Sequence, residues 1–424
     1  MALSSPLRAL SSRNYRLYFT GQIISLLGTW MTQTATLWLV YQISSSAFYL
    51  GLVGFVSQAP AFLLGPIAGT WVDRVNRHRL LILTQVLSMA QSFALAFFAF
   101  AKTIDIPHLL VLGAVQGVIN AFDMPARQAL VVEFVEDREH LGNAIALNST
   151  SFNLARLGGP ALAGLTIAAV GPAWCYFIDG LSFLAVIFCL LLMRFPPREF
   201  VPPSKKALAD LRDGLRYAWT HPVIRTLIVL VMTVSFFGFS FSVLVPIFAR
   251  DVFHGDARTL GFLMSASGCG ALTAALSLSV REGVKGLSKT IVAGGLMLGV
   301  GLMLFSRVHI LWLALPCMFS VGLGGVLLMA SSNTVIQTVV DNQMRGRVMA
   351  LFTMAFTGTA PLSNLAMGWL AQRIGGATVL AFTGAICVLA AWLFHRKLPS
   401  VRAAVAKLRE TAAPTATPQE AHPA

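Results

Sequence analysis

The sequence has few charged residues, and acidic residues are especially scarce. Asp and Glu together number 17 among 424 residues, and all charged residues make up 11% of the chain, against roughly 25% in an average soluble domain. An ordinary soluble domain is therefore excluded. The chain also lacks a phosphate loop of the G-x-x-x-x-G-K type and any nucleophile-base arrangement, which argues against an ATP-driven pump and against an enzyme.

Cysteine is scarce too, with five residues that all fall inside apolar runs. None forms a C-x-x-C pair, and none has a histidine at metal-ligand spacing. We expect these cysteines to act as small buried hydrophobic side chains. The sequence thus predicts no metal site.

What the sequence has instead is a series of long hydrophobic runs. Hydrophobic residues make up 56% of the chain, and the mean hydropathy is +0.73. A helix needs about 20 mainly apolar residues to cross a bilayer, and twelve runs meet this requirement. They cover about 17–43, 49–72, 80–101, 108–126, 143–170, 173–193, 223–249, 259–280, 290–306, 310–338, 347–372 and 377–395.

Basic residues are distributed unequally between the two sides of these runs. The net charge of +14 and the pI near 10.2 would suit a nucleic-acid partner, but the loops argue against one. With the N-terminus inside, 25 of the 31 Lys and Arg residues lie in inner segments, 5 lie in outer loops and Arg156 lies within a run. The positive-inside rule then predicts a protein of the bacterial cytoplasmic membrane with both termini in the cytoplasm.

The order of the runs predicts an all-α polytopic membrane protein with twelve transmembrane helices in two pseudo-symmetric six-helix bundles. The bundles cover 1–195 and 223–395, a cytoplasmic linker covers 196–222, and a disordered cytoplasmic tail covers 396–424. In the linker, apolar residues at helical spacing up to Trp219 predict a helix on the membrane surface. Weak internal similarity favours two parallel repeats, since Leu50-Gly51 and Leu260-Gly261 open the second and eighth runs.

The turn between the second and third runs resembles a signature of the major facilitator superfamily. It reads Gly69-Thr70-Trp71-Val72-Asp73-Arg74-Val75-Asn76-Arg77-His78-Arg79. Gly69 permits close helix contact, and Asp73 can face the positive end of a neighbouring helix. The resemblance implies a latch that opens and closes as the two halves move. We expect its members to be Gly69, Asp73, Arg74, Arg77, Asp123 and Arg127.

The fifth run contains a second resemblance. Arg156-Leu157-Gly158-Gly159-Pro160-Ala161-Leu162-Ala163-Gly164 is similar to the glycine-proline motif of superfamily members that act as antiporters. Small residues allow close helix approach, and proline removes a backbone hydrogen bond. The resemblance implies a hinge formed by Gly158, Gly159, Pro160 and Gly164; a packing patch without directional meaning is the alternative.

Further residues resemble the branch of the superfamily that contains the enterobactin exporter and macrolide efflux proteins. They include Gly28-Thr29-Trp30 in the first run, Asp123 to Ala129 after the fourth, and Arg345 to Met349 before the eleventh. This resemblance implies export of a small molecule. One departure is Gly113, which stands where many drug-proton antiporters carry an arginine before Gln-Gly in the fourth run.

Arg156 and Asp179 are charged residues deep inside runs. An unpaired arginine there costs about 2.5–3.5 kcal/mol on insertion scales, so it is functional by default. Arg156 could attract an anionic substrate, tune a carboxylate during proton exchange, or pair with carbonyls or asparagines of neighbouring helices. Asp179 could carry protons or make a hydrogen bond between helices. Both are candidates for coupling.

Polar and aromatic stripes suggest which residues line a substrate cavity. In the resembling superfamily, helices 1, 4, 7 and 10 surround the pathway. A spacing of three or four residues puts the members of a stripe on one helix face. The candidates are Gln22, Ser25, Thr29 and Gln33 in the first run, Gln116 and Asn120 in the fourth, Phe237 and Phe241 in the seventh, and Asn333 in the tenth. Packing between helices is the alternative for each.

The sequence thus predicts a secondary active transporter that exports a small amphipathic molecule, either a drug-like compound or a siderophore, by alternating access. Proton antiport is the expected coupling, with the proton gradient as energy source and no cofactor. The alternatives are a lipid or lysophospholipid flippase of the same fold, an importer, and a membrane sensor that transports nothing. The expected partners are the small-molecule substrate and the lipid bilayer, and a monomer is among the oligomeric states allowed.

Overall fold

The computed structural model describes residues 5–72, 74–134, 140–193, 207–281, 283 and 286–398, and within these ranges the regular structure is helical. The first half contains α1 (Arg13–Ser44), α2 (Ala47–Val72), α3 (Arg77–Phe100), α4 (Ile106–Phe134), α5 (Leu141–Val170) and α6 (Ala173–Leu191). After α7 (Ala207–Thr220), the second half contains α8 (Pro222–Gly238), α9 (Phe241–Ile247), α10 (Ala257–Ser279), α11 (Leu287–Phe305), α12 (Leu311–Val339), α13 (Arg345–Thr357), α14 (Thr359–Ile374) and α15 (Gly376–Arg396).

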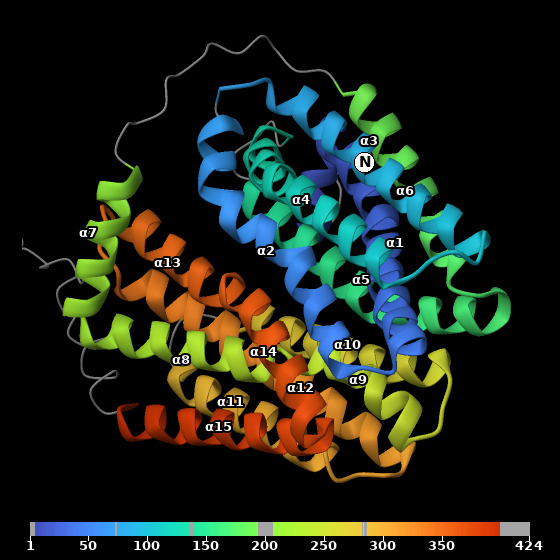
Figure 1. Cartoon of the computed structure of the whole chain (residues 1–424). Helices are drawn as coiled ribbons and strands as arrows, with labels where there is room; N and C mark the ends of the chain where they lie inside the picture. The colour runs from blue at the N-terminus through green and yellow to red at the C-terminus, as the bar shows by residue number, and fades with distance from the viewer. Residues whose placement is uncertain are drawn as a thin grey trace, which may run out of the picture.

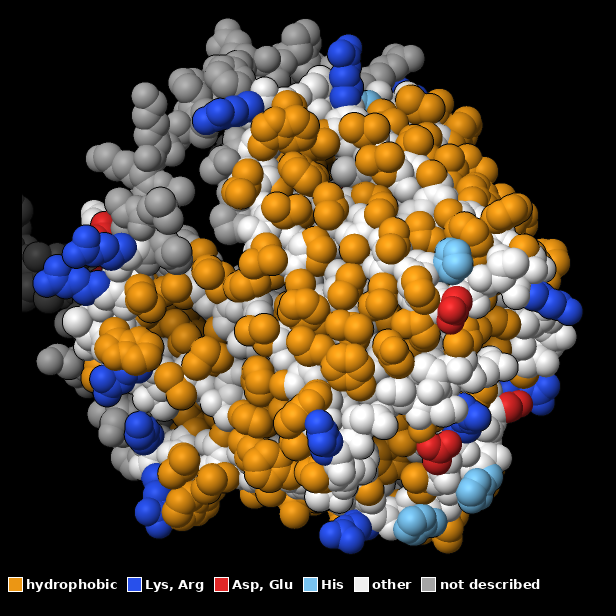
Figure 2. Space-filling view, viewed as in Figure 1, with side chains coloured by type: hydrophobic (Ala, Val, Ile, Leu, Met, Phe, Trp, Pro, Cys, Tyr) orange, Lys and Arg blue, Asp and Glu red, His pale blue; other side chains and the backbone are white. Residues whose placement is uncertain are grey.

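Most of these helices are suited to a membrane. Eleven helical stretches of the described residues are long and apolar enough to cross one, and hydrophobic side chains cover the middle of the surface seen in Figure 2, with Lys and Arg mainly toward its edges. α5 is 30 residues long but is not among the eleven, because Asn148, Asn153 and Arg156 interrupt its apolar sequence. The predicted membrane-spanning class is confirmed, and the count of twelve spans stays a prediction.

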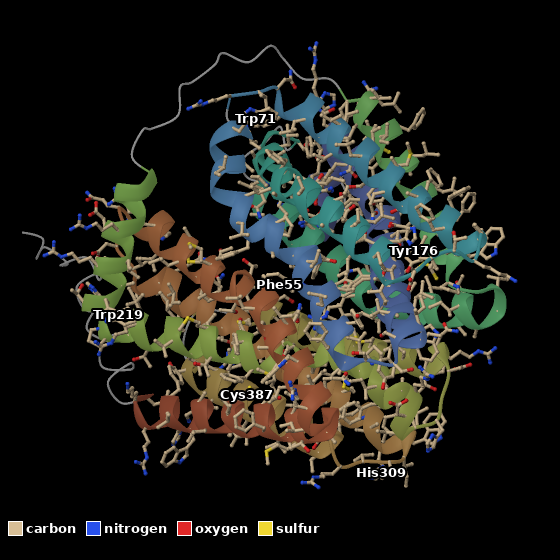
Figure 3. All side chains as sticks on the ribbon, viewed as in Figure 1. Phe55, Trp71, Tyr176, Trp219, His309 and Cys387 are labelled. Atoms are coloured by element: carbon tan, nitrogen blue, oxygen red, sulfur yellow. The ribbon has the colours of Figure 1, made fainter. Side chains whose placement is uncertain are left out.

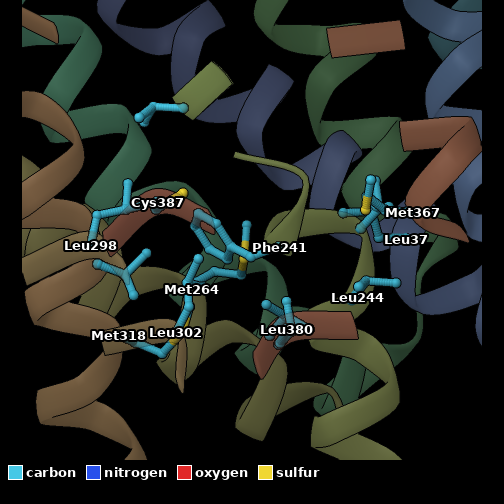
Figure 4. Packing of buried hydrophobic residues seen from close by; sticks show 14 of the residues in the cluster. Leu37, Phe241, Leu244, Met264, Leu298, Leu302, Met318, Met367, Leu380 and Cys387 are labelled. Carbon is cyan, nitrogen blue, oxygen red and sulfur yellow. The ribbon is translucent and has the colours of Figure 1, made fainter. Parts of the chain in front are cut away.

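The helices form two bundles that lie side by side (Figure 1). In the first, α1 packs against α5 and α6, and α2 packs against α4; in the second, α12 packs against α10 and α11, and α11 packs against α15. Buried hydrophobic residues fill both bundles. Figure 4 shows part of this core, in which Phe241, Met264, Leu298 and Leu302 lie close together.

The two halves touch most closely at one end of the molecule. We call the end at which α1 ends and α2 begins the far face, and the end at which α1 begins and α15 ends the terminal face. Near the far face, α2 packs against α14 and α5 packs against α10. A methyl group added to Gly368 would lie 2.7 Å from the Ala47 carbonyl oxygen, and one added to Gly261 would lie 2.6 Å from that of Pro160. These pairs therefore meet backbone to backbone.

Toward the terminal face, glycines of the two halves lie in open space. A methyl group added to Gly65 or Gly69 of α2, to Gly142 of α5 or to Gly346 of α13 would meet no neighbouring atom of the described residues within 4 Å. In Figure 1 the ribbons of α2 and α13 diverge toward this end. The expected close helix contact of Gly69 is thus absent in this arrangement, because the neighbouring helices of the other half lie apart from it.

Two predicted spans of the second half are interrupted near their middle. The run 223–249 is divided into α8 and α9, where Ser242 and Val243 donate backbone hydrogen bonds to residues three positions earlier. The run 347–372 is divided into α13 and α14 at Gly358, three residues before Pro361. Proline lacks the N–H that would continue the helix and clashes with the preceding turn. Interrupted spans expose backbone polar groups, so they are found where protein or a cavity covers them.

The helix α7 is attached to the second half. The Tyr217 hydroxyl donates to Asp341 Oδ2 at 2.8 Å, and Arg347 lies 3.4 Å from the Asp213 carboxylate. Trp219 is half exposed and lies at the outer edge of the helix in Figure 3. The position of this helix on a membrane surface stays a prediction. Asp73, linker residues 196–206 and tail residues 399–424 lie outside the described residues.

The contact between α5 and α10 makes a testable prediction about glycine. Gly261→Leu should lower the thermal midpoint of the purified protein, because overpacking a tight contact costs about 1–3 kcal/mol. Gly142→Leu is the matched control, since this position on α5 has open space. Scanning fluorimetry in detergent measures both. Equal midpoints for the two variants would contradict a close backbone contact at Gly261.

Candidate functional site

A buried polar network joins three helices of the first half. Asp123 of α4 accepts hydrogen bonds from Thr84 Oγ1 at 2.8 Å and from Gln85 Nε2 at 2.7 Å, both on α3. The Arg127 guanidinium donates to the same carboxylate at 2.8 Å, and its other nitrogen donates to Gln22 Oε1 of α1. The side chains of Asp123 and Arg127 are only 11% and 20% exposed. The network thus fixes α1, α3 and α4 to one another.

The expected latch is only partly visible. Asp123 and Arg127 are brought together, but the hydrogen bonds of Asp123 go to α3 and to Arg127 rather than to the arginines of the turn before α3. Arg74 is exposed on that turn. Asp73, the central residue of the expected latch, lies outside the described residues. The roles of Gly69, Arg74 and Arg77 in a latch therefore stay predictions.

Asp179 lies inside the first bundle. It is 2% exposed, and Ser92 of α3 donates to its Oδ2 at 2.9 Å. A methyl group added to Gly28 of α1 would lie 2.7 Å from Asp179 Oδ1. The carboxyl group therefore lies where α1, α3 and α6 meet. This position favours the hydrogen bond between helices, and leaves a role in proton transfer as a proposal.

The polar stripes of α1 and α4 divide into buried and accessible parts. Gln22 and Ser25 are buried, whereas Thr29 and Gln33, further along α1, are exposed. Gln116 of α4 donates to Ser88 of α3 at 3.2 Å and to Asn120 at 3.1 Å. Thr29 and Gln33 are therefore the members of these stripes that are most accessible to a ligand.

The candidate cavity residues of the second half, which are Phe237, Phe241 and Asn333, differ in how accessible they are. Phe241 is 3% exposed and belongs to the hydrophobic core (Figure 4). The Phe237 ring packs edge-on against Phe382 of α15, with centroids 6.4 Å apart. Asn333 of α12 is partly buried and accepts a hydrogen bond from Gln337. Phe241 is thus the least accessible of the three.

Aromatic residues that the sequence did not single out meet at the two helix interruptions. Phe239, between α8 and α9, lies 5.7 Å from Phe356 of α13 by ring centroids. Phe62 of α2 lies against Gly358, so close that a methyl group added there would clash with its ring. An aromatic residue of the first half thus touches the interrupted helix of the second half. The signal available in the sequence was the Gly358 and Pro361 pair.

Polar contacts at the far face also join the halves. The Tyr41 hydroxyl of α1 donates to Asp251 in the π-helical turn Phe248–Val252 that follows α9. Arg250 donates to the Tyr41 carbonyl oxygen and to Ser45 Oγ, both at 3.0 Å. Ser46 donates to Gln372 of the second half at 3.0 Å. From the sequence, Arg250 was only one of the basic residues of the outer loops. Its partners could not be predicted, because they lie more than 200 positions away in the chain.

The glycine-proline motif of α5 has two contact surfaces. Gly158 and Gly159 face Leu27 and Trp30 of α1 in the same half. Pro160 and Gly164 face α10 of the other half, where a methyl group on Gly164 would lie 2.7 Å from the Ala257 carbonyl oxygen. Arg156, at the start of the motif, is partly exposed. α5 stays one continuous helix through Pro160, so the motif acts here as a contact surface, and a hinge role stays a prediction.

The described residues do not form a metal site. Among the described residues, no group of three or more His, Cys, Asp or Glu side chains is placed to hold a metal ion.

The sequence matches one family along nearly its whole length. A sequence model of the family described as Transmembrane secretion effector matches residues 4–419. The Staphyloferrin A transporter of Staphylococcus aureus is 26% identical over 394 residues, which cover 90% of this chain and 96% of that protein. The multidrug efflux pump Tap of Mycolicibacterium fortuitum is 28% identical over 368 residues, which cover 84% and 89%.

Solved structures of transporters have the same architecture. A POT family transporter in complex with 5-aminolevulinic acid superposes with a TM-score of 0.74 at 11% identity, over 92% of this chain and 97% of that one. A bacterial homologue of the human lysosomal transporter Spinster gives a TM-score of 0.69 at 15% identity, over 94% and 98%. At these identities the likeness concerns the fold alone, and it confirms the predicted fold class.

The buried pair of Asp123 and Arg127 predicts non-additive effects of mutation. Asp123→Asn and Arg127→Gln should each lower the thermal midpoint strongly, because removing one partner of a buried ion pair costs about 3–5 kcal/mol. The double variant should lose less than the sum of the two single losses. Thermal unfolding of the wild type, the two single variants and the double variant gives the data for this double-mutant cycle. Strict additivity would show that the two side chains do not depend on each other.

Proposed function

Because the chain belongs to the transmembrane secretion effector family of the major facilitator superfamily, we propose that it exports a small amphipathic molecule by alternating access. The family consists of membrane transporters, so the chain is not an enzyme. The similarity to the Staphyloferrin A transporter and to the multidrug efflux pump Tap supports a siderophore or a drug-like compound as the exported molecule.

The observation that carries this proposal is the difference between the two ends of the molecule. At the far face the halves meet backbone to backbone at Gly261 and Gly368, whereas Gly65 and Gly69 near the terminal face have no neighbouring atom within 4 Å among the described residues. Two halves that are in close contact from the far face to the middle of α5, and lie apart at the terminal face, can rock about a site between them. The structure then corresponds to the state open at the terminal face.

The direction of opening follows from the basic residues. Inner segments of the predicted topology hold 25 Lys and Arg residues and outer loops hold 5. By the positive-inside rule, the terminal face is cytoplasmic. A ligand enters the open side from the cytoplasm, and closure of that side releases it at the far face. Both termini are then cytoplasmic.

Proton antiport is the proposed coupling, and the network around Asp123 supports it. Protonation of this carboxylate would remove the charge that attracts Arg127 and one acceptor of the Thr84 and Gln85 hydrogen bonds. Because Arg127 also contacts Gln22 of α1, the packing of α1 against α3 and α4 would change with the proton. Proton uptake by a buried carboxylate whose hydrogen bonds join helices would therefore be linked to helix movement.

Lipid transport is a second candidate, favoured by one feature of the outer surface. A groove of about 460 Å³ lies between α11 and α15 and is lined by Leu296, Met303, Ala385, Val388, Leu389 and Trp392. An acyl chain could occupy such an apolar groove. It lies between helices of the second half rather than between the halves, so alternating access does not act on it directly.

Export can be tested in cells that lack their own efflux pumps. Cells that express the wild type should retain less ethidium, macrolide or catecholate siderophore than cells with an empty vector, and an uncoupler should abolish the difference. Gly261→Leu should behave like the empty vector, because the far face cannot close around the added side chain.

Three other outcomes would redirect the proposal. Export that persists with the uncoupler would contradict proton coupling. Greater retention in cells with the wild type would indicate import. Retention equal to the empty vector for every probe, together with lysophospholipid movement in reconstituted vesicles, would establish the lipid alternative.

A further inference from the structure

Arg156 occupies the middle of α5. It lies 15 residues after Leu141 and 14 residues before Val170, the first and last residues of the helix. At 1.5 Å per residue these separations are about 22 Å and about 21 Å. The Cα atom of Arg156 therefore lies near the middle of a helix that is long enough to cross a membrane.

The side chain of Arg156 starts on the face of α5 opposite to that of Leu154 and Leu165. Leu154 and Leu165 are each 48% exposed, and they share one helix face because eleven residues make three turns. Arg156 precedes Leu165 by nine residues, which is two and a half turns, so it lies on the other side of the helix. Ser149 and Asn153 share its face, and neither is buried.

The two flanks of that face contact different halves of the protein. On one flank, Phe152 packs edge-on against Trp30 of α1, with centroids 5.7 Å apart. On the other flank, Ser265 of α10 donates to the Leu157 carbonyl oxygen at 2.7 Å. Arg156 therefore faces the junction of α1 and α10, where the first and second halves meet. We call this junction the wedge.

The positive charge of Arg156 is not balanced by a neighbouring group. Among the described residues, no hydrogen bond or ion pair reaches its side chain. The two acids deep in the helices have other partners, since Asp123 binds Arg127 and Asp179 binds Ser92. Among the described residues, Arg156 is thus a cation without a bonded partner in the middle of α5, on the side where α1 and α10 meet.

We propose that Arg156 binds an anionic group of the transported molecule, a carboxylate in particular. An unpaired arginine in the membrane interior is costly unless water or an anion reaches it, and a guanidinium offers two parallel donors that match a carboxylate. The inference rests on the proposed function in taking the wedge as the ligand pathway, and it adds the charge of the ligand. Ser149 and Asn153 supply neutral polar contacts on the same helix face.

The backbone at Arg156 connects this site to the movement of the halves. Pro160 has no N–H, so the Arg156 carbonyl oxygen lacks its usual helical donor four residues later. Gly268 of α10 covers this oxygen, since a methyl group added to Gly268 would lie 2.7 Å from it. The residue that binds the anion therefore also forms part of the contact between α5 and α10. An anion bound there lies at a contact that must rearrange when the halves rock.

Chemical modification tests the anion site without knowledge of the natural ligand. The purified protein is treated with phenylglyoxal, which reacts with accessible guanidinium groups, and modification of Arg156 is followed by mass spectrometry. Naphthalene-2-carboxylate and citrate are the anionic probes, and naphthalene-2-carboxamide is the neutral match. We expect Arg156 to react, and each anion to slow its reaction by about tenfold at about ten times its Kd. The amide should leave the rate unchanged, and exposed Arg74 should react equally in all samples.

Two results would overturn the inference. One is equal modification of Arg156 with and without both anions at their highest soluble concentrations, and the other is absence of modification while Arg74 reacts. Transport separates this inference from the proposed function: proton-dependent export of a carboxylate probe that is undiminished in Arg156→Gln overturns the anion site and leaves export intact. Anion protection of Arg156 without any proton-dependent flux supports the site and contradicts the transport proposal.

Discussion

The close backbone contact between helices of different halves is the constraint on which the rest of the structure depends. Gly261 and Gly368 bring α10 against α5 and α14 against α2 at distances that no larger residue permits. Such contacts consist of many weak dispersion attractions, so they can separate without breaking a buried ion pair. Tyr41 and Arg250 make polar contacts with the opposite half at the far-face end of these helix contacts. They fix the relative position of the two halves close to the water.

The two halves differ in how they are held together internally. The first half contains the charged network of Asp123 and Arg127, which ties α1, α3 and α4 into one unit. The second half contains two interrupted helices, and aromatic side chains rather than charges meet at the interruptions. Phe62 of the first half lies against one of them. A rigid bundle thus faces a bundle with two natural points of bending, and the unpaired Arg156 lies between them.

The sequence predicts the membrane class, the fold and the helix-forming runs well, because bilayer thickness and periodicity act on local sequence. It also places Asp123 and Arg127 in one expected latch, and the structure pairs these two side chains, whereas the role of that latch stays a prediction. It misses the hydrogen bond between Tyr41 and Asp251, which are 210 residues apart. It also misses the contact between Phe62 and Gly358. Such pairs depend on helix rotation and on the relative placement of two bundles, which no local pattern encodes. The same limit explains Gly69, whose neighbours depend on which face is open.

The central claim is that the two faces open in alternation, and paired distance measurements test it most directly. Spin labels at Lys102 and Arg307 report the far face, and labels at Arg79 and Arg345 report the terminal face, in a protein whose five native cysteines are replaced. The account predicts that acidification or ligand lengthens the first distance while it shortens the second. Distances that change together, or that both stay fixed under every condition that supports transport, would contradict alternating access by these two halves.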